Sequence, residues 1–286
     1  MTMFQYLLYR CAQELVIRLP LGLSYWIADR IADFHFLFSL KSRRQVLKNL
    51  DWIHNGEVPR LQNAREVFRN FGEYLVDFLR LPRIGREEFF KVVEVTGLEH
   101  IQKALGERKG VIVVTAHFGN WEWGGVGLSL LGYPVHALAL NHTHQRVNHF
   151  FVKQRTQKGV HVVSMNDSSW EIARYLAKNE ILLLVADRDF SNNGVPVSFL
   201  GRKISFPRGP AALSRRWGSP LVVGFVIRSH KGSFRLVFEA PLHAEQTENI
   251  SSDIGRTTQS VASLFEGYIR RYPTQWLLFQ GLRELS

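Results

Sequence analysis

The sequence predicts an α/β fold, with a mostly parallel central sheet flanked by helices and a helical segment before it. Two observations predict it. Compact apolar runs rich in β-branched residues recur after about residue 90, and helical patterns separate them. Such alternation builds parallel sheets, because each parallel pair of strands needs a crossover connection. Before residue 90 the patterns are helical.

The clearest predicted strand is the run from Gly110 to Thr115, whose unbroken apolar composition is typical of a strand buried on both faces. The predicted strands cover residues 92–95, 110–115, 135–140, 160–164, 181–185, 221–227 and 234–238. The helical patterns between and after them cover residues 120–131, 144–158, 168–179, 209–217 and 251–272.

The N-terminal part predicts two or three helices over residues 4–55, with Pro20 opening the second, where its missing N–H costs nothing. A further helix over residues 63–81 is ended by Pro82. We therefore expect residues 1–85 to form a helical segment and residues 86–286 an α/β body. Because no flexible linker separates them, they are expected to make one integrated domain.

The first 44 residues have the composition of helices that lie in a membrane interface, with apolar and aromatic residues interspersed with charges. The longest uncharged run, residues 19–28, is far shorter than the roughly 20 residues that span a bilayer. We expect peripheral or monotopic attachment to anionic lipid; the alternative is that these helices pack on the protein's own core, and both can hold on different faces. The basic residues concerned are Arg10, Arg18, Lys41, Arg43 and Arg44.

Composition and charge exclude some of the functions that this chain could have. The chain has 286 residues, of which 45% are hydrophobic and 21% charged, which is ordinary globular usage. A net charge of +11 attracts anionic partners, but no nucleic-acid-binding motif accompanies it, so we expect no nucleic acid; a generally basic surface is the alternative. The single cysteine, Cys11, excludes an internal disulfide. His142 and His144 lack a third ligand at suitable spacing, so we expect no metal.

Residues 113–125 carry the strongest chemical signal, because an apolar strand leads directly into His117 and Gly119 then permits a tight turn before a helix. The carboxyl ends of strands in an open α/β sheet border the ligand crevice, so His117 is placed to act as a general base. Glu122 lies five residues later and is expected to reach back and hold one ring nitrogen. Backbone N–H groups at Gly119 and Asn120 are expected to serve an oxyanion or a phosphate. The alternative is that His117 only satisfies a loop hydrogen bond.

Five further residues are candidates for substrate binding. Arg155 and Arg188 are fixed positive charges that can hold a phosphate or a developing negative charge, and Asp187 is expected to orient Arg188. Asn120 either lines the site or caps the helix, with capping favoured. Arg208 precedes a helix and resembles a phosphate-contacting residue. A structural ion pair is the alternative for Arg155, Asp187 and Arg188.

The motif TAHFGNWEWGG at residues 115–125 resembles the bacterial lipid A lauroyl and myristoyl acyltransferases and the related phosphatidylinositol mannoside acyltransferases, within the glycerolipid acyltransferase superfamily. Further segments match the family in order, so the resemblance covers most of the chain. They are residues 43–50, 151–159, 186–190, 194–201, 207–211 and 272–276. The chain departs from the family in its charged first helix and in residues 277–283.

The resemblance implies an O-acyltransferase that uses acyl-carrier protein or acyl-CoA as donor and needs no cofactor. The implied acceptor is a hydroxyl of a membrane glycolipid: a lipid A precursor first, with phosphatidylinositol mannoside or a lysophospholipid as the alternative. The implied location is the cytoplasmic face of the inner membrane. A non-catalytic membrane-binding protein is a rival, which the His117 and Glu122 motif disfavours. A serine hydrolase is disfavoured because the Gly-x-Ser-x-Gly pattern is absent.

Overall fold

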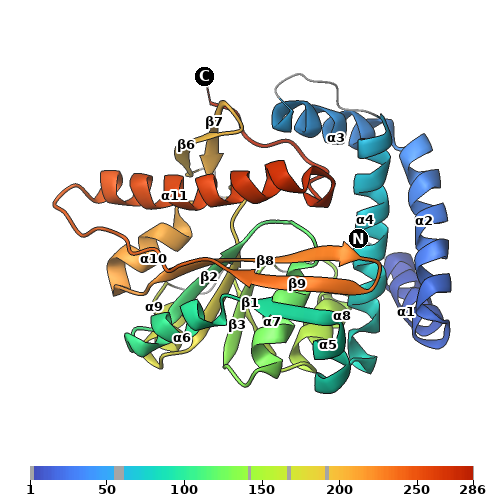
Figure 1. Ribbon diagram of the computed structural model, residues 1–286, viewed down its shortest axis with the longest axis horizontal. Coiled ribbons are helices and arrows are strands. Elements are labelled where there is room, and N and C mark those ends of the chain that lie inside the picture. Colours follow the sequence, from blue (N-terminus) through green and yellow to red (C-terminus); the bar gives the residue numbers. More distant parts are fainter. Residues whose placement is uncertain (1–2, 55–60, 141–142, 166–168, 191–192, 286) are drawn as a thin grey trace.

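The centre of the molecule is a seven-stranded sheet with the strand order β1-β9-β8-β2-β5-β3-β4 (Figure 1). This computed structural model describes residues 3–54, 61–140, 143–165, 169–190 and 193–285. The sheet strands are β1 (Val93–Thr96), β2 (Val111–Thr115), β3 (Val135–Ala139), β4 (Val160–Ser164), β5 (Ile181–Val185), β8 (Leu221–His230) and β9 (Ser233–Phe238). A separate antiparallel hairpin joins β6 (Val195–Phe199) to β7 (Arg202–Phe206).

Five strands of the sheet, β8, β2, β5, β3 and β4, run parallel to one another, which confirms the predicted mostly parallel sheet. β9 pairs antiparallel with β8, and β1 pairs parallel with β9, so these two strands run the opposite way. The carboxyl ends of the five parallel strands therefore share one edge, which is where α/β proteins bind ligands.

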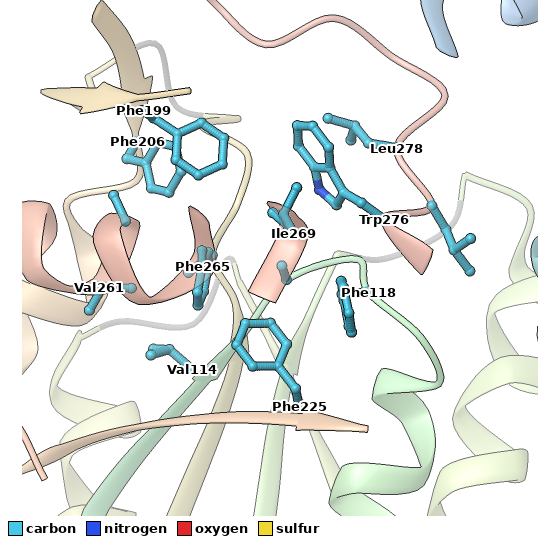
Figure 2. Packing of buried hydrophobic residues seen from close by; sticks show 14 of the residues in the cluster. Val114, Phe118, Phe199, Phe206, Phe225, Val261, Phe265, Ile269, Trp276 and Leu278 are labelled. Carbon is cyan, nitrogen blue, oxygen red and sulfur yellow. The ribbon is translucent and has the colours of Figure 1, made fainter. Parts of the chain in front are cut away.

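Helices cover both faces of the sheet. On one face lie α5 (Arg86–Val92), α6 (Leu98–Gly106) and α7 (Trp121–Leu130), and on the other α9 (Ser169–Ala177), α10 (Gly209–Trp217) and α11 (Ile250–Arg271). Side chains alternate along β2, so Val111 and Val113 pack toward α5–α7, whereas Ile112 and Val114 pack toward α9–α11. Burial on both faces is why this strand is apolar throughout. Figure 2 shows Val114 in the second layer, near Phe225 and Phe265.

The N-terminal helices are α1 (Met3–Arg18), α2 (Leu21–Phe38), α3 (Leu40–Ile53) and α4 (Leu61–Arg80), and they stand together beside the sheet (Figure 1). α4 contributes Phe68 to the core layer that contains α11 and Phe78 to the layer that contains α7. α8 (Gln145–Thr156) packs on β4 and on α1. Within the described residues, no helix is long and apolar enough to cross a membrane.

Candidate active site

His117 and Asp187 meet because their strands are neighbours in register. β2 and β5 are parallel, with Thr115 opposite Val185, so each residue lies two positions beyond its strand at the same edge. Asp187 Oδ1 lies 2.7 Å from His117 Nδ1, and Asp187 Oδ2 accepts the backbone N–H of His117 at 3.0 Å. The pairing of two strands therefore holds an imidazole against a carboxylate.

The Asp187 carboxylate is fully buried and has three donors. Besides the two from His117, the indole Nε1 of Trp276 donates to Oδ2 at 3.0 Å. Because an ionised carboxylate only accepts hydrogen bonds, the ring proton of His117 lies on Nδ1. Nε2 then keeps its lone pair and has no partner among the described residues, so it is free to accept a proton from a substrate.

The charges around His117 raise its pKa above the ordinary value for histidine. Burial of the ring lowers the pKa of His117, but the charge and hydrogen bond of Asp187 more than offset burial, so the pKa is raised from 6.5. Burial raises the pKa of Asp187, and its bonds to His117 and Trp276 overcome this and lower it below its usual value. The carboxylate stays ionised and stabilises the imidazolium that forms when the base takes a proton.

Glu122 does not hold the imidazole, which corrects the predicted His117–Glu122 pair. Its two oxygens accept from Arg155 in a bidentate ion pair, with Nε to Oε2 at 2.8 Å and Nη2 to Oε1 at 2.6 Å. The expectation that Asp187 orients Arg188 is corrected likewise, because Asp187 orients His117. Glu122 is nevertheless close enough for its charge to contribute to the raised pKa of His117.

His117 opens into a pocket of about 300 Å³ whose polar lining includes the Glu122–Arg155 pair. Its apolar lining includes residues at or just beyond the ends of β3 and β5 and one from α8: Leu138, Leu140, Leu184, Phe190 and Phe151. The pocket has the mixture typical of ligand sites, a mostly apolar wall with a few convergent polar groups.

Aromatic packing fixes the imidazole from the side. Trp121 meets the His117 ring edge-on with centroids 5.3 Å apart, and Tyr74 of α4 stacks on Trp121 at 4.1 Å. Both aromatic residues also line the pocket. The N-terminal helices therefore reach the site through α4.

Asn120 is fully buried and lies outside the pocket lining, which corrects the expectation that it contacts substrate. Its side chain caps α7 by accepting the N–H of Trp123 at 3.4 Å, which confirms the favoured capping role, and it donates to Asp77 Oδ2 at 3.1 Å. Asn120 thus links the start of α7 to α4.

The backbone donors expected at Gly119 and Asn120 are also occupied. Gly119 N donates to Gln275 O at 2.8 Å, and Asn120 N donates to Val226 O at 3.1 Å, so neither amide is free for an oxyanion. Gly119 has a φ of +55°, and a Cβ there would collide with the carbonyl oxygen of Val226, so the close approach requires glycine.

The candidate arginines Arg188 and Arg208 lie at different distances from the pocket. Arg188 is half-buried, with its guanidinium 4.5 Å from the ring centroid of the pocket residue Phe190, and its charge acts on the pKa of His117. Arg208 is exposed at the start of α10 and is not brought into the lining of the pocket. Of the two, only Arg188 is close to the base.

Residues 275–277 hold the loop that carries His117, a role that the residue types in this segment do not predict. Leu277 N donates to His117 O at 2.7 Å, Gln275 O accepts from Gly119, and Trp276 donates to Asp187. Figure 2 shows Trp276 between Phe118 and Leu278 in the core layer above the sheet. The only signal for this segment in the sequence was its match to the family's C-terminal signature.

No three His, Cys, Asp or Glu side chains among the described residues are grouped so that they could hold a metal ion. His142 lies outside the described residues. The site thus offers a histidine base, a buried carboxylate and an apolar pocket at the carboxyl edge of a parallel sheet. A site with these features in an α/β fold is suited to general-base chemistry on a substrate with a large apolar part.

Comparison with known proteins agrees with this class. The family model described as bacterial lipid A biosynthesis acyltransferase matches residues 2–282, so the chain belongs to that family and is an acyltransferase. The phosphatidylinositol mannoside acyltransferase of Mycolicibacterium smegmatis is 26% identical over 76% of this chain and 70% of its own length. The lipid A biosynthesis palmitoleoyltransferase of Escherichia coli K12 is 25% identical over 91% of this chain and 85% of its own.

Proposed function

We propose that this protein moves a fatty acyl chain from acyl-carrier protein or acyl-CoA to a hydroxyl of a lipid A precursor. The observation that carries the chemistry is the His117–Asp187 pair, whose free Nε2 opens into an apolar pocket. The lipid A acceptor is favoured because the palmitoleoyltransferase aligns with 91% of the chain. A phosphatidylinositol mannoside is the second candidate acceptor, on the slightly higher identity of the M. smegmatis relative.

The proposed reaction is a direct transfer. Nε2 of His117 removes the proton from the acceptor hydroxyl as its oxygen attacks the thioester carbonyl carbon. The tetrahedral intermediate collapses, the C–S bond breaks, and the imidazolium returns the proton to the leaving thiolate. Asp187 stabilises the imidazolium throughout and is a positioning residue.

Arg188 is the proposed stabiliser of the developing oxyanion, because its guanidinium lies near His117 and has no carboxylate partner among the described residues. Arg155 is already neutralised by Glu122, which uses one hydrogen each of Nε and Nη2 and leaves Nη1 for a substrate oxygen. Arg208 remains a proposed contact for a donor phosphate, because α10 starts at the carboxyl edge and a helix N-terminus favours anions.

We also propose that α1 and α2 attach the enzyme to the cytoplasmic face of the inner membrane. The inner side of α2 packs through Tyr25, Ala32 and Phe36, yet its outer side is apolar too. The large side chains exposed there by 59–69% are Trp26, Ile31, Phe34, Leu37 and Phe38. Exposed apolar side chains of this kind, with exposed Arg and Lys residues near them, suit the interface of an anionic bilayer.

The function is tested by incubating the purified chain with acyl-carrier protein or acyl-CoA donors and each acceptor lipid, and by identifying products by mass spectrometry. His117→Ala is expected to reduce transfer about 10²–10⁴-fold without loss of the fold by circular dichroism, because the base is removed. Transfer to phosphatidylinositol mannoside alone would move the acceptor to the second candidate. Activity of His117→Ala within about tenfold of the parent would refute the base.

Membrane attachment is tested by co-sedimentation with vesicles of neutral or mixed anionic lipid, at low and high salt. Charge reversal at exposed Arg10, Arg18, Lys41 and Arg44 should weaken binding to anionic vesicles, each charge contributing about 1 kcal/mol. Binding that ignores lipid charge, salt and reversal would contradict the electrostatic part, and no binding to any vesicle would contradict attachment itself.

A further inference from the structure

A second cavity of about 300 Å³ lies between the start of α2, the end of α4, α5 and the β8–β9 turn. We call it the α2–α5 cavity. α4 and α7 separate it from the active-site pocket, since α4 gives Tyr74 to the pocket and Asp77 to the cavity, and α7 gives Glu122 to the pocket and Trp123 to the cavity. The proposed acyl transfer makes no use of it.

Two arginines and two acidic residues line the cavity, and neither arginine forms an ion pair among the described residues. Arg80 and Arg83 line it, and their acidic neighbours there are Asp77 and Glu88. Asp77 is already bound by Arg228 at 2.6 Å. Glu88 faces Lys158, where burial lowers the lysine pKa and the Glu88 charge opposes that shift. In the described part of the chain, neither carboxylate forms an ion pair with either guanidinium.

Each guanidinium donates some of its N–H groups to the protein and keeps others free. Arg80 Nη1 donates to the carbonyls of Val16 and Leu19, and Arg83 Nη1 donates to that of Ile17, so each stabilises the carboxyl end of α1. Among the described residues, the Nη2 and Nε groups of both arginines have no acceptor. Two guanidiniums with donors to spare are suited to a phosphate, which accepts several charge-assisted hydrogen bonds.

A further polar group in the lining lacks a partner. Trp123 is 3% exposed, and its indole Nε1 is a buried donor with no acceptor within the described part of the chain. A buried N–H of this kind costs free energy unless a ligand or water accepts from it. The cavity wall thus contains two guanidiniums with free donors and an orphaned indole N–H.

The apolar part of the lining leads toward the outer surface of α2. Leu21, Ile84 and Val92 line the cavity, and Leu21 is also 37% exposed as the first residue of α2. Leu23 and Trp26, exposed by 43% and 59%, follow it on that helix. A ligand with its phosphate at the arginines can therefore continue into apolar tails along α2.

We propose that the α2–α5 cavity binds the phosphate of an anionic phospholipid that is neither donor nor acceptor in the reaction. The lipid's tails would lie against the exposed apolar side chains of α2, and its phosphate would join α1 to the body of the enzyme through Arg80 and Arg83. The inference uses the exposed surface of α2 but does not depend on acyl transfer.

The test is isothermal titration of the full chain with dihexanoyl phosphatidylglycerol below its micelle concentration. Dihexanoyl phosphatidylcholine and inorganic phosphate serve as parallel titrants. Arg83→Gln removes one cation, and Val92→Phe fills the cavity without changing charge. Each is expected to raise the Kd for the phosphatidylglycerol about tenfold, Arg83→Gln by the loss of one charge-assisted contact and Val92→Phe by occupying the ligand's space. Arg86→Gln, an exposed arginine of α5 outside the lining, is the matched control and should leave the Kd unchanged.

The outcomes separate the possible ligands. Tight binding of phosphatidylglycerol that weakens in Arg83→Gln and Val92→Phe, but not in Arg86→Gln, supports the proposal. Equal binding of inorganic phosphate would overturn the lipid as the source of the phosphate, and equal binding of phosphatidylcholine would overturn the need for negative charge. Equal losses in Arg83→Gln and Arg86→Gln, or an unchanged Val92→Phe, would overturn the site. Circular dichroism and acyl transfer of each variant check the fold independently.

Discussion

The charge of Asp187 determines the pH range in which His117 can act as a base. The pKa of His117 is raised from 6.5 because Asp187 outweighs burial, and the ring accepts a proton only when it is neutral. Asp187→Asn removes the charge and leaves burial, so the histidine pKa should fall below 6.5. The acidic limb of kcat/KM should then move to lower pH while kcat falls. An acidic limb that stays in place would show that another group titrates there.

Glu122 is expected to act through Arg155 rather than through the base. Glu122→Gln removes one charge from a mostly buried bidentate pair and should cost about 2 kcal/mol of unfolding free energy. Its loss of kcat should be smaller than that of His117→Ala, because Asp187 still holds the ring. Arg155→Gln on top of Glu122→Gln should restore part of the lost stability, measured by denaturant unfolding. A kcat as low as that of His117→Ala would contradict this assignment.

At the scale of residues, the sequence pointed to His117 but not to the carboxylate that binds its ring. His117 could be found because it directly follows a strand and precedes a glycine turn. Glu122 is the nearest carboxylate in the sequence after His117, whereas Asp187 lies 70 residues after His117. Only the β2–β5 register brings Asp187 to the ring, and one sequence does not show which strands are neighbours.

Among the elements, the segment around Trp276 has the most direct effect on the site. Trp276→Phe keeps an aromatic ring in the core and removes only the N–H that binds Asp187 Oδ2. We expect unfolding free energy to fall by roughly 1–3 kcal/mol, because a buried acceptor loses a donor. We expect kcat to fall more than KM changes. Leu278→Val, a similar loss in the same core, should lower stability without the fall in kcat; equal kcat values in the two variants would refute a positioning role.

The sequence predicts the helices and strands that have a clear hydrophobic pattern, and it does not predict those that lack one. β2 was clear because it is buried on both faces, and α4 because its apolar residues recur at helical spacing. The β6–β7 hairpin was missed as two strands, since its turn uses Leu200 and Gly201, both at positive φ. Leucine seldom adopts that conformation, so Leu-Gly does not predict a hairpin turn in the way that Asn-Gly or Asp-Gly does. α5 has only 7 residues, too few for a clear period.

For the molecule as a whole, a buried ion network attaches the N-terminal helices to the sheet. Arg228 of β8 binds Asp77 at 2.6 Å and Glu73 at 3.3 Å, both on α4 and nearly fully buried. Arg228→Met should cost about 3–5 kcal/mol, because the buried Asp77 loses its cation and Glu73 keeps only Lys231. Arg202→Met, which breaks an exposed pair with Glu284, should cost under about 1 kcal/mol. Denaturant unfolding compares them, and similar losses would contradict a stabilising role for the network.

The contacts of Trp276 also have a consequence for biosynthesis. The ribosome adds residue 276 long after His117 and Asp187, yet Trp276 supplies one of the three donors to the Asp187 carboxylate, and Leu277 binds the loop that carries His117. A nascent chain that has formed the sheet but not yet released this segment therefore lacks a fixed base. Because domains fold as units during synthesis, we expect the site to become complete in one late step, when residues 275–277 join the sheet.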